Sequence, residues 1–142
     1  MIRLGKMTDY GIVLLSCFTR DPERTVFTAR DLAEASRLPL PTVSKLLKTL
    51  SRQALLVSHR GVKGGYELAR EPGRISVHDI IQALEGPVSV TECGTHSGGC
   101  EIETTCPVRG HWGKINSAIR DALSGLTLRD MGPGRPAGRS QL

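Results

Sequence analysis

The chain of 142 residues has few aromatic side chains: two Phe, two Tyr and one Trp make up 4% of it. A hydrophobic core must therefore be built mainly from Leu, Ile, Val and Ala. The chain has no apolar run near the roughly 20 residues that a membrane-spanning helix needs, and its first residues lack a signal-peptide pattern. We expect a cytoplasmic protein with one compact domain and an appended helix, and neither a membrane nor a secreted protein.

Patterns typical of enzymes are also missing. The chain has no P-loop, no Ser/His/Asp set and no paired carboxylates arranged for acid–base chemistry. The two-residue cysteine spacing of zinc ribbons and thioredoxin-like redox pairs is absent as well. We therefore predict a protein that is not an enzyme and has no small-molecule substrate.

Positive charge is concentrated in one part of the chain. There are 19 Lys and Arg against 14 Asp and Glu, a net charge of +5. Residues 36–74 hold eight basic and two acidic residues, so this basic block carries +6 and the remainder −1. Residues 75–107 contain no Lys or Arg. A basic block suits a polyanion such as DNA, although a solvated basic face would have the same composition.

Two capping patterns mark the first two helices. Thr8 is expected to cap a helix over 9–18. Thr28 and Asp31 have the spacing of a capping box, which predicts a short helix over 29–35. Each helix would then start where a side chain can accept from free backbone N–H groups.

A third, basic helix follows after a short turn. Pro41 suits the first helical position because its missing N–H is not needed there, and apolar residues recur at helical spacing up to Arg52. Two short helices joined by a tight turn, the second basic on its exposed side, are typical of a DNA-binding helix-turn-helix. The residues expected to face DNA from this helix are Thr42, Ser44, Lys45 and Lys48.

A glycine-rich hairpin comes directly after this recognition helix. Residues 55–60 and 66–69 have strand patterns on either side of a turn that holds three glycines. Glycine permits positive φ and a close approach of the backbone to a phosphate or groove. Because Arg60 and Lys63 lie at its tip, we predict that the hairpin is the wing of a winged helix and contacts DNA.

The second half of the chain is predicted to contain two more helices. Ser76 and Asp79 form a second capping box for a helix over 77–85, whereas 88–105 shows no regular period. Pro107 is expected to start a long last helix. Apolar residues recur along it every three or four positions, at Val108, Trp112, Ile115, Ile119 and Ala122/Leu123.

This apolar seam extends over about five turns, roughly 27 Å at 1.5 Å per residue. The small domain before it has little surface left to cover such a seam. We therefore predict that the helix packs on the same helix of a second copy, since palindromic DNA also favours a two-fold dimer. After Met131 the chain is rich in Gly and Pro and is expected to be disordered.

The four cysteines fall into two groups. Cys17 lies among apolar residues of the first helix, so a buried structural thiol is expected. Cys93, Cys100 and Cys106 are separated by six and five residues in a polar, irregular segment. Loops of this width can surround an object larger than one ion, as iron–sulfur clusters require. An iron–sulfur cluster, a mononuclear zinc site and a thiol switch all remain open on this spacing.

Several parts of the chain together resemble one family of proteins: residues 3–10, 38–48, 60–66 and 75–86, with the three cysteines. The family is that of the winged-helix iron–sulfur transcriptional regulators, which includes the Isc-operon regulator, the nitric-oxide-sensing repressor and the Suf-operon regulators. The resemblance covers about residues 2–131. Residues 91–93, 106–109 and 127–131 most resemble the Suf-operon branch.

The resemblance implies a homodimeric transcription factor that represses iron–sulfur assembly genes and whose bound cluster, 2Fe–2S or 4Fe–4S, changes its hold on DNA. Cys93, Cys100 and Cys106 match the family's cluster cysteines. Residues 6–9 match the Lys-x-Thr-Asp pattern in which the nitric-oxide sensor supplies a fourth ligand from the other subunit, so Asp9 is the first candidate. His111 is the second. A zinc- or thiol-based stress regulator without a cluster is the alternative.

The predicted fold class is mainly α with a small β wing, that is, a winged helix-turn-helix with a long C-terminal dimerisation helix. The winged domain is expected over 1–86 and the cysteine-bearing loop over 87–106. The dimerisation helix and a short docking segment are expected over 107–131, and a tail over 132–142. Double-stranded DNA and a second copy of the chain are the expected partners.

Overall fold

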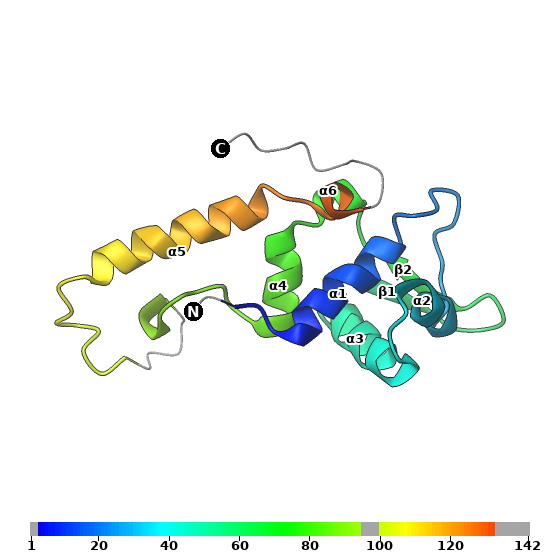
Figure 1. The fold of residues 1–142 in the computed structure, drawn as a ribbon, viewed down its shortest axis with the longest axis horizontal. Helices are drawn as coiled ribbons and strands as arrows, with labels where there is room; N and C mark the ends of the chain where they lie inside the picture. The colour runs from blue at the N-terminus through cyan, green and yellow to red at the C-terminus, as the bar shows by residue number, and fades with distance from the viewer. Residues whose placement is uncertain (1–2, 95–99, 133–142) are drawn as a thin grey trace.

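The computed structural model describes residues 3–94 and 100–132, so the tail predicted over 132–142 lies outside the described residues except for Gly132. The wing and the N-terminal end of the last long helix lie toward opposite ends of the longest axis (Figure 1). The elements in chain order are α1 (Lys6–Cys17), α2 (Ala29–Ser36), α3 (Leu40–Arg52), β1 (Leu56–His59), β2 (Gly65–Leu68), η1 (Pro72–Arg74), α4 (Val77–Glu85), η2 (Glu92–Gly94), α5 (Arg109–Ser124) and α6 (Leu128–Met131).

A leucine-rich core joins helices α1 to α4 and the base of the wing. Phe18 and Phe27 are its two Phe side chains, and their rings pack edge to face with centroids 5.2 Å apart. Burial of such apolar area stabilises the fold by about 25 cal/mol per Å2. The fully enclosed core side chains are Leu14, Leu15, Leu32, Val43, Leu46, Leu47, Leu50, Ile75, Ile80 and Leu128.

Two predicted capping boxes are confirmed, and they fix the starts of α2 and α4. In the first, the Thr28 N–H donates to Asp31 at 2.9 Å and the Asp31 N–H donates to the Thr28 hydroxyl at 3.1 Å. Hydrogen bonding to its carboxylate, first from the Thr28 N–H and then from the Thr28 side chain, holds the pKa of Asp31 below its ordinary value. Ser76 and Asp79 bond to each other in the same way at the start of α4.

The prediction that Thr8 caps the first helix is wrong. α1 begins at Lys6, and Thr8 lies inside it with only 1% of its surface exposed. Its hydroxyl donates to Oε1 of Glu85 at 2.6 Å, and the Gly5 N–H donates to the same oxygen at 2.6 Å. The carboxylate of Glu85 therefore holds the start of α1 against the end of α4. The two residues are 77 positions apart, so local spacing could not indicate this contact.

The wing is a two-stranded antiparallel hairpin in which His59 pairs with Gly65 and Leu56 with Leu68. A backbone bridge outside the hairpin anchors it. The Tyr66 N–H donates to the Phe27 carbonyl at 2.7 Å, and the Phe27 N–H donates to the Tyr66 carbonyl at 2.9 Å. Because of this bridge, the segment before α2 and the base of the wing are held together.

The chain after α5 returns to the winged domain. The Val77 N–H donates to the Leu126 carbonyl at 2.8 Å, the Leu128 N–H donates to the Ile75 carbonyl at 2.8 Å, and the Leu128 side chain is buried. Thr127 and Asp130 form a third capping box at the start of α6, which the sequence analysis missed although the spacing is the same as in the other two. The predicted docking segment thus packs on the winged domain through these backbone bonds and the buried Leu128 side chain.

The last long helix, α5, starts at Arg109 and not at Pro107, which precedes it in a turn. The C-terminal end of α5 lies beside α4, and its N-terminal turns extend away from the winged domain (Figure 1). Within the described ranges, no helix combines the length and the apolar character that a membrane crossing demands.

Gly65 is expected to be essential for anchoring the wing. Its φ is +152°, and a Cβ added there would lie 2.6 Å from the Phe27 carbonyl oxygen. Since that oxygen belongs to the anchoring bridge and cannot move freely, Gly65→Ala should lower the free energy of unfolding by about 1–3 kcal/mol. Urea denaturation followed by circular dichroism measures this loss.

Gly61→Ala is the matched control for this prediction. Gly61 also has positive φ, at +105°, but no atom lies within 4 Å of an added Cβ. Gly61→Ala should therefore lower the free energy of unfolding only by the backbone strain of about 1 kcal/mol. Equal losses in the two variants would contradict the steric explanation.

Candidate nucleic-acid interface and cysteine segment

Helix α3 presents one apolar and one polar face. Val43, Leu46, Leu47 and Leu50 are buried in the core, which fixes the rotation of the helix. The polar face carries exposed Lys45, Lys48 and Arg52, with Thr42 and Ser44 half-buried beside them. The structure thus places all four predicted DNA-contacting residues of this helix away from the core.

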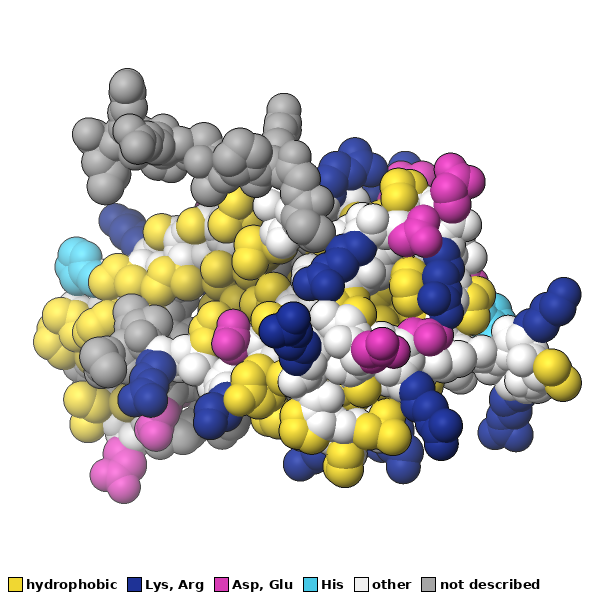
Figure 2. Space-filling model, turned by 45° about the vertical axis from the view of Figure 1, so that its right-hand side comes forward, with side chains coloured by type: hydrophobic (Ala, Val, Ile, Leu, Met, Phe, Trp, Pro, Cys, Tyr) yellow, Lys and Arg dark blue, Asp and Glu magenta, His cyan; other side chains and the backbone are white. Residues whose placement is uncertain are grey.

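The tip of the wing is basic and exposed. Arg60 and Lys63 are exposed, and Val62 between them is as open to solvent as a residue can be, with 107% relative exposure. Figure 2 shows Lys and Arg side chains on the protruding wing. Between the two strands of the wing, His59 lies 2.8 Å from Glu67, so one of the few acids of this region already has a partner.

In residues 3–94 and 100–132, the cations of this face are not paired with acids. Within the described ranges, no ion pair is formed by any of the four basic residues predicted to bind DNA, namely Lys45, Lys48, Arg60 and Lys63. Unpaired cations on a helix face and a neighbouring wing can bind phosphates without first breaking internal ion pairs. This electrostatic arrangement fits a polyanion.

The three cysteines after α4 are free and half-buried. The Thr91 hydroxyl lies 3.1 Å from Sγ of Cys93, close enough for a hydrogen bond with either atom as donor. Among the residues that the structure describes, no three His, Cys, Asp or Glu side chains are grouped closely enough to hold a metal ion. One chain by itself therefore does not gather Cys93, Cys100 and Cys106 into a ligand set.

Among the residues that the structure describes, neither candidate for a fourth ligand forms a metal-binding group with two cysteines of the same chain. Asp9 is exposed in the first turn of α1, next to Thr8, whose hydroxyl binds Glu85. His111 is exposed in the first turn of α5. Glu85 is the last residue of α4, so Asp9 is tied to the point where the cysteine segment leaves the winged domain.

Two contacts that the sequence analysis missed hold the ends of the cysteine segment. The Val90 N–H donates to Oδ1 of Asn116 at 2.9 Å, and Asn116 is only 2% exposed. Arg109 donates to Glu103 at 2.9 Å. The signal for Asn116 was present, since it is a polar residue four positions after Trp112, where the apolar seam would be expected to continue.

The apolar seam of α5 is largely uncovered. Val108, Trp112 and Ile115 are 45%, 36% and 42% exposed, and Ile119 and Leu123 are half-buried. Asn116 is the single buried residue of this 16-residue helix. A helix with this much exposed apolar surface has an unpartnered face.

Cys17 differs from the other cysteines, as predicted. It is buried in the core, and its Sγ donates to the Val13 carbonyl at 3.4 Å. Burial raises the pKa of this thiol by more than nearby Arg20 lowers it. Because the thiolate is the reactive and metal-binding form, Cys17 is an inert structural residue.

Comparison with known proteins agrees with this architecture. The model of the Rrf2 family, described as an iron-dependent transcriptional regulator, matches residues 4–133. The transcriptional regulator IscR of Cronobacter sakazakii is 25% identical over 130 residues, which are 92% of this chain and 80% of that protein.

Solved structures are similar as well. CymR (YrzC), the global cysteine regulator of B. subtilis, matches with a TM-score of 0.70 and 27% identity over 92% of this chain and 96% of that one. IscR of T. potens matches with a TM-score of 0.68 and 28% identity over 92% of this chain and 85% of that one. The assignment to the Suf-operon branch stays a prediction. The chain belongs to the Rrf2 family of winged-helix transcriptional regulators, which are DNA-binding proteins and not enzymes.

Proposed function

We propose that this protein is a homodimeric repressor of iron–sulfur assembly genes, acting in the cytoplasm, that senses cluster status through a bound iron–sulfur cluster. The observation that carries the proposal is the combination of an unpaired basic face on α3 and the wing with three free, half-buried thiols in one irregular segment. The match to a family described as iron-dependent supports the same function.

The donor chemistry of the cysteine segment fits an iron–sulfur cluster. Cys93, Cys100 and Cys106 form no disulfide and are accessible, as thiolate ligands must be. With three cysteines in the segment, a fourth ligand has to come from elsewhere, and Asp9 of the partner subunit is our first candidate and His111 the second. When bound, the cluster would supply chemistry that responds to iron and oxidants. The Thr91 hydroxyl would donate a hydrogen bond to Sγ of Cys93.

DNA would be bound by α3 and the wing together. Lys45 and Lys48 are placed to enter the major groove, with Thr42 and Ser44 able to contact bases or phosphates. Arg60 and Lys63 at the wing tip would reach the adjacent minor groove, because a narrow groove concentrates negative potential that attracts Arg.

The uncovered seam of α5 would form the dimer interface. Val108, Trp112 and Ile115 would be buried against the same residues of a second copy, which removes the exposed apolar face from water. The dimer would then place two recognition helices at a spacing that matches a palindromic operator.

Cluster status would reach DNA through contacts at the ends of the cysteine segment. The segment starts after Glu85, which binds Thr8, and is bonded to α5 through Asn116. Losing the cluster would free the segment and change how α5 and α1 are held, which shifts the spacing of the two recognition helices. An order–disorder step of this kind is an established type of switch.

A thiol-based regulator without a cluster is the second candidate function. The structural similarity to CymR, a global cysteine regulator, favours it. In this case Cys93, Cys100 and Cys106 would respond directly to oxidants or hold zinc, and DNA binding by α3 and the wing would be unchanged.

Anaerobic purification distinguishes the two functions. We expect wild-type protein to be coloured and to contain iron and acid-labile sulfide, and single substitutions of Cys93, Cys100 or Cys106 by Ser to lose both. Cys17→Ala is the control and should keep the cluster because Cys17 lies in the core. One of the variants Asp9→Ala and His111→Ala should have a visible spectrum that differs from that of the wild type. The residue replaced in that variant is the fourth ligand. A colourless, zinc-loaded wild type contradicts the cluster proposal.

Arg60→Ala should weaken binding to duplex DNA selected by the wild type from a randomised pool. We expect a loss of roughly 1–3 kcal/mol if Arg60 reads bases or groove shape. Lys45→Ala should also reduce, by about one, the steepness with which the logarithm of the binding constant falls with the logarithm of the salt concentration. Fluorescence anisotropy titration measures both, with Lys114→Ala on α5 as a matched loss of charge away from the DNA face. Unchanged affinity in Arg60→Ala would exclude its role.

Ile115→Asp should convert the dimer to a monomer. An aspartate at the centre of the seam would place a charge in an apolar interface, where it has no partner. Sedimentation at micromolar concentration should show a dimer for the wild type and for the control Lys114→Asp, and a monomer for Ile115→Asp. A monomeric wild type would contradict the proposed interface.

A further inference from the structure

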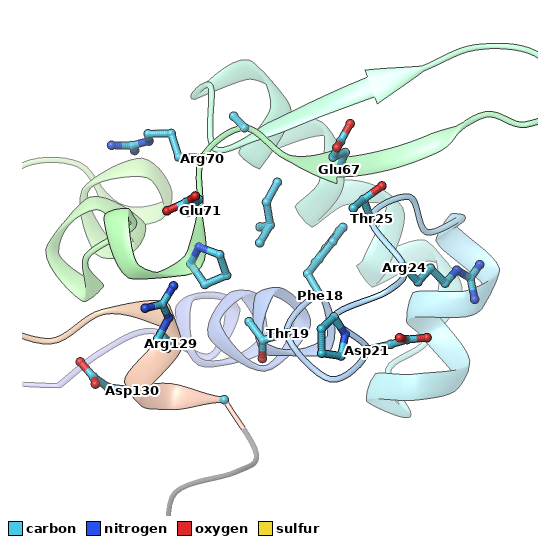
Figure 3. Close-up of a pocket in the computed structure, with 15 residues that line it drawn as sticks. Phe18, Thr19, Asp21, Arg24, Thr25, Glu67, Arg70, Glu71, Arg129 and Asp130 are labelled. Atoms are coloured by element: carbon cyan, nitrogen blue, oxygen red, sulfur yellow. The ribbon is translucent and has the colours of Figure 1, made fainter.

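A cavity of about 810 Å3 opens between the end of α1, the loop that follows it, the base of the wing and α6 (Figure 3). Its walls come from residues 18–25, 67–72 and 129–132. Neither α3 nor the cysteine segment contributes to it. Its volume falls within the range of about 300–1,000 Å3 that is usual for small-molecule sites.

The wall of the cavity is apolar between α1 and the wing. Phe18, Pro22, Leu68 and Pro72 line it. Phe18 is held by its edge-to-face contact with Phe27, so this part of the wall is already formed without a ligand. It can accept an apolar group of a bound molecule without rearrangement.

One cation and one anion of the wall have no partner in the described part of the chain. Figure 3 shows Arg129 and Glu71 on the same side of the cavity. The Arg129 guanidinium packs over Gly73, where an added Cβ would lie 3.2 Å from its Cζ, so its position is defined. In that part of the chain, neither the Arg129 guanidinium nor the Glu71 carboxylate forms a hydrogen bond or an ion pair, even with the other.

The remaining charged groups of the wall are already engaged. Arg24 pairs with Asp31, Arg70 with Asp79 at 3.8 Å, and Glu67 with His59 at 2.8 Å. Asp21 accepts from the Glu23 N–H, and Asp130 caps α6. Arg129 and Glu71 are therefore the groups that a ligand can engage without competition.

We propose that this cavity binds a small zwitterion of the amino-acid type with an apolar side chain. Its carboxylate would pair with Arg129, its ammonium group with Glu71, and its side chain would lie against Phe18, Leu68 and Pro72. A simple carboxylate would be repelled by Glu71, and a simple amine by Arg129. A molecule that carries both charges satisfies both groups at once.

Such a ligand would act on elements that the proposed cysteine sensor does not reach directly. Arg129 belongs to α6, which follows the dimerisation helix, and Glu71 follows the wing. A ligand bound to both would fix the wing relative to the end of α5. The site therefore adds a second input, a small-molecule effector, to the proposed cluster sensing.

Isothermal titration of the full-length protein with L-leucine, L-methionine and L-phenylalanine tests the proposal. We expect saturable binding of at least one of them. For leucine, the matched probes are 4-methylpentanoate, which lacks the ammonium group, and 3-methylbutylamine, which lacks the carboxylate. Each should bind about tenfold more weakly or worse than the amino acid, because one charged contact is lost.

Two variants locate the site. Arg129→Gln and Glu71→Gln should each weaken amino-acid binding about tenfold or more. Arg30→Gln, an exposed arginine of α2 outside the cavity, should leave binding unchanged. The melting temperature of each variant without ligand reports folding, and having two variants keeps the test valid if one of them is unstable. Absence of binding by all three amino acids, equal binding of an analogue, or binding that survives both substitutions would overturn the proposal.

Discussion

The carboxylate of Glu85 joins the two ends of the winged domain. It accepts from the Thr8 hydroxyl and the Gly5 N–H, each at 2.6 Å, and so fixes the first turn of α1 to the last turn of α4. Thr8 is buried, so its hydroxyl would have no partner if the carboxylate were lost, and an unsatisfied buried group costs about 1–3 kcal/mol. The position of Asp9 and the exit of the cysteine segment both depend on this contact.

The proposed DNA-binding surface and the proposed sensor differ in charge as well as in position. The unpaired cations lie on α3 and the wing, whereas the cysteine segment contains acids and no Lys or Arg. In the proposed function, ligand thiolates would therefore not compete with DNA for the same cations. Communication between the two parts would have to pass through packed elements, and Glu85 with Thr8 and Asn116 with Val90 are two of the contacts that could carry it.

The sequence predicted the parts of the fold that depend on neighbouring residues. The capping boxes at Thr28 and Ser76, the buried face of α3 and the hairpin follow from local spacing, and the structure has them all. The sequence could not indicate the Glu85–Thr8 contact or the Asn116–Val90 bond, because these join residues that are far apart in the chain. The sequence also could not indicate how Asp9 and His111 lie relative to the cysteines, because a ligand that a second copy would supply has no signal in local spacing.

Helix α5 connects the two sites that we propose. It begins three residues after Cys106 and leads into α6, whose Arg129 lines the cavity. A rigid helix transmits a displacement at one end to the other, so a change in the cysteine segment and a ligand in the cavity would act on the same element. The bonds of Leu126 to Val77 and of Leu128 to Ile75 hold the C-terminal end of that helix on the winged domain. Either input would therefore alter the angle between the dimer axis and the wing, which is the quantity that operator spacing selects.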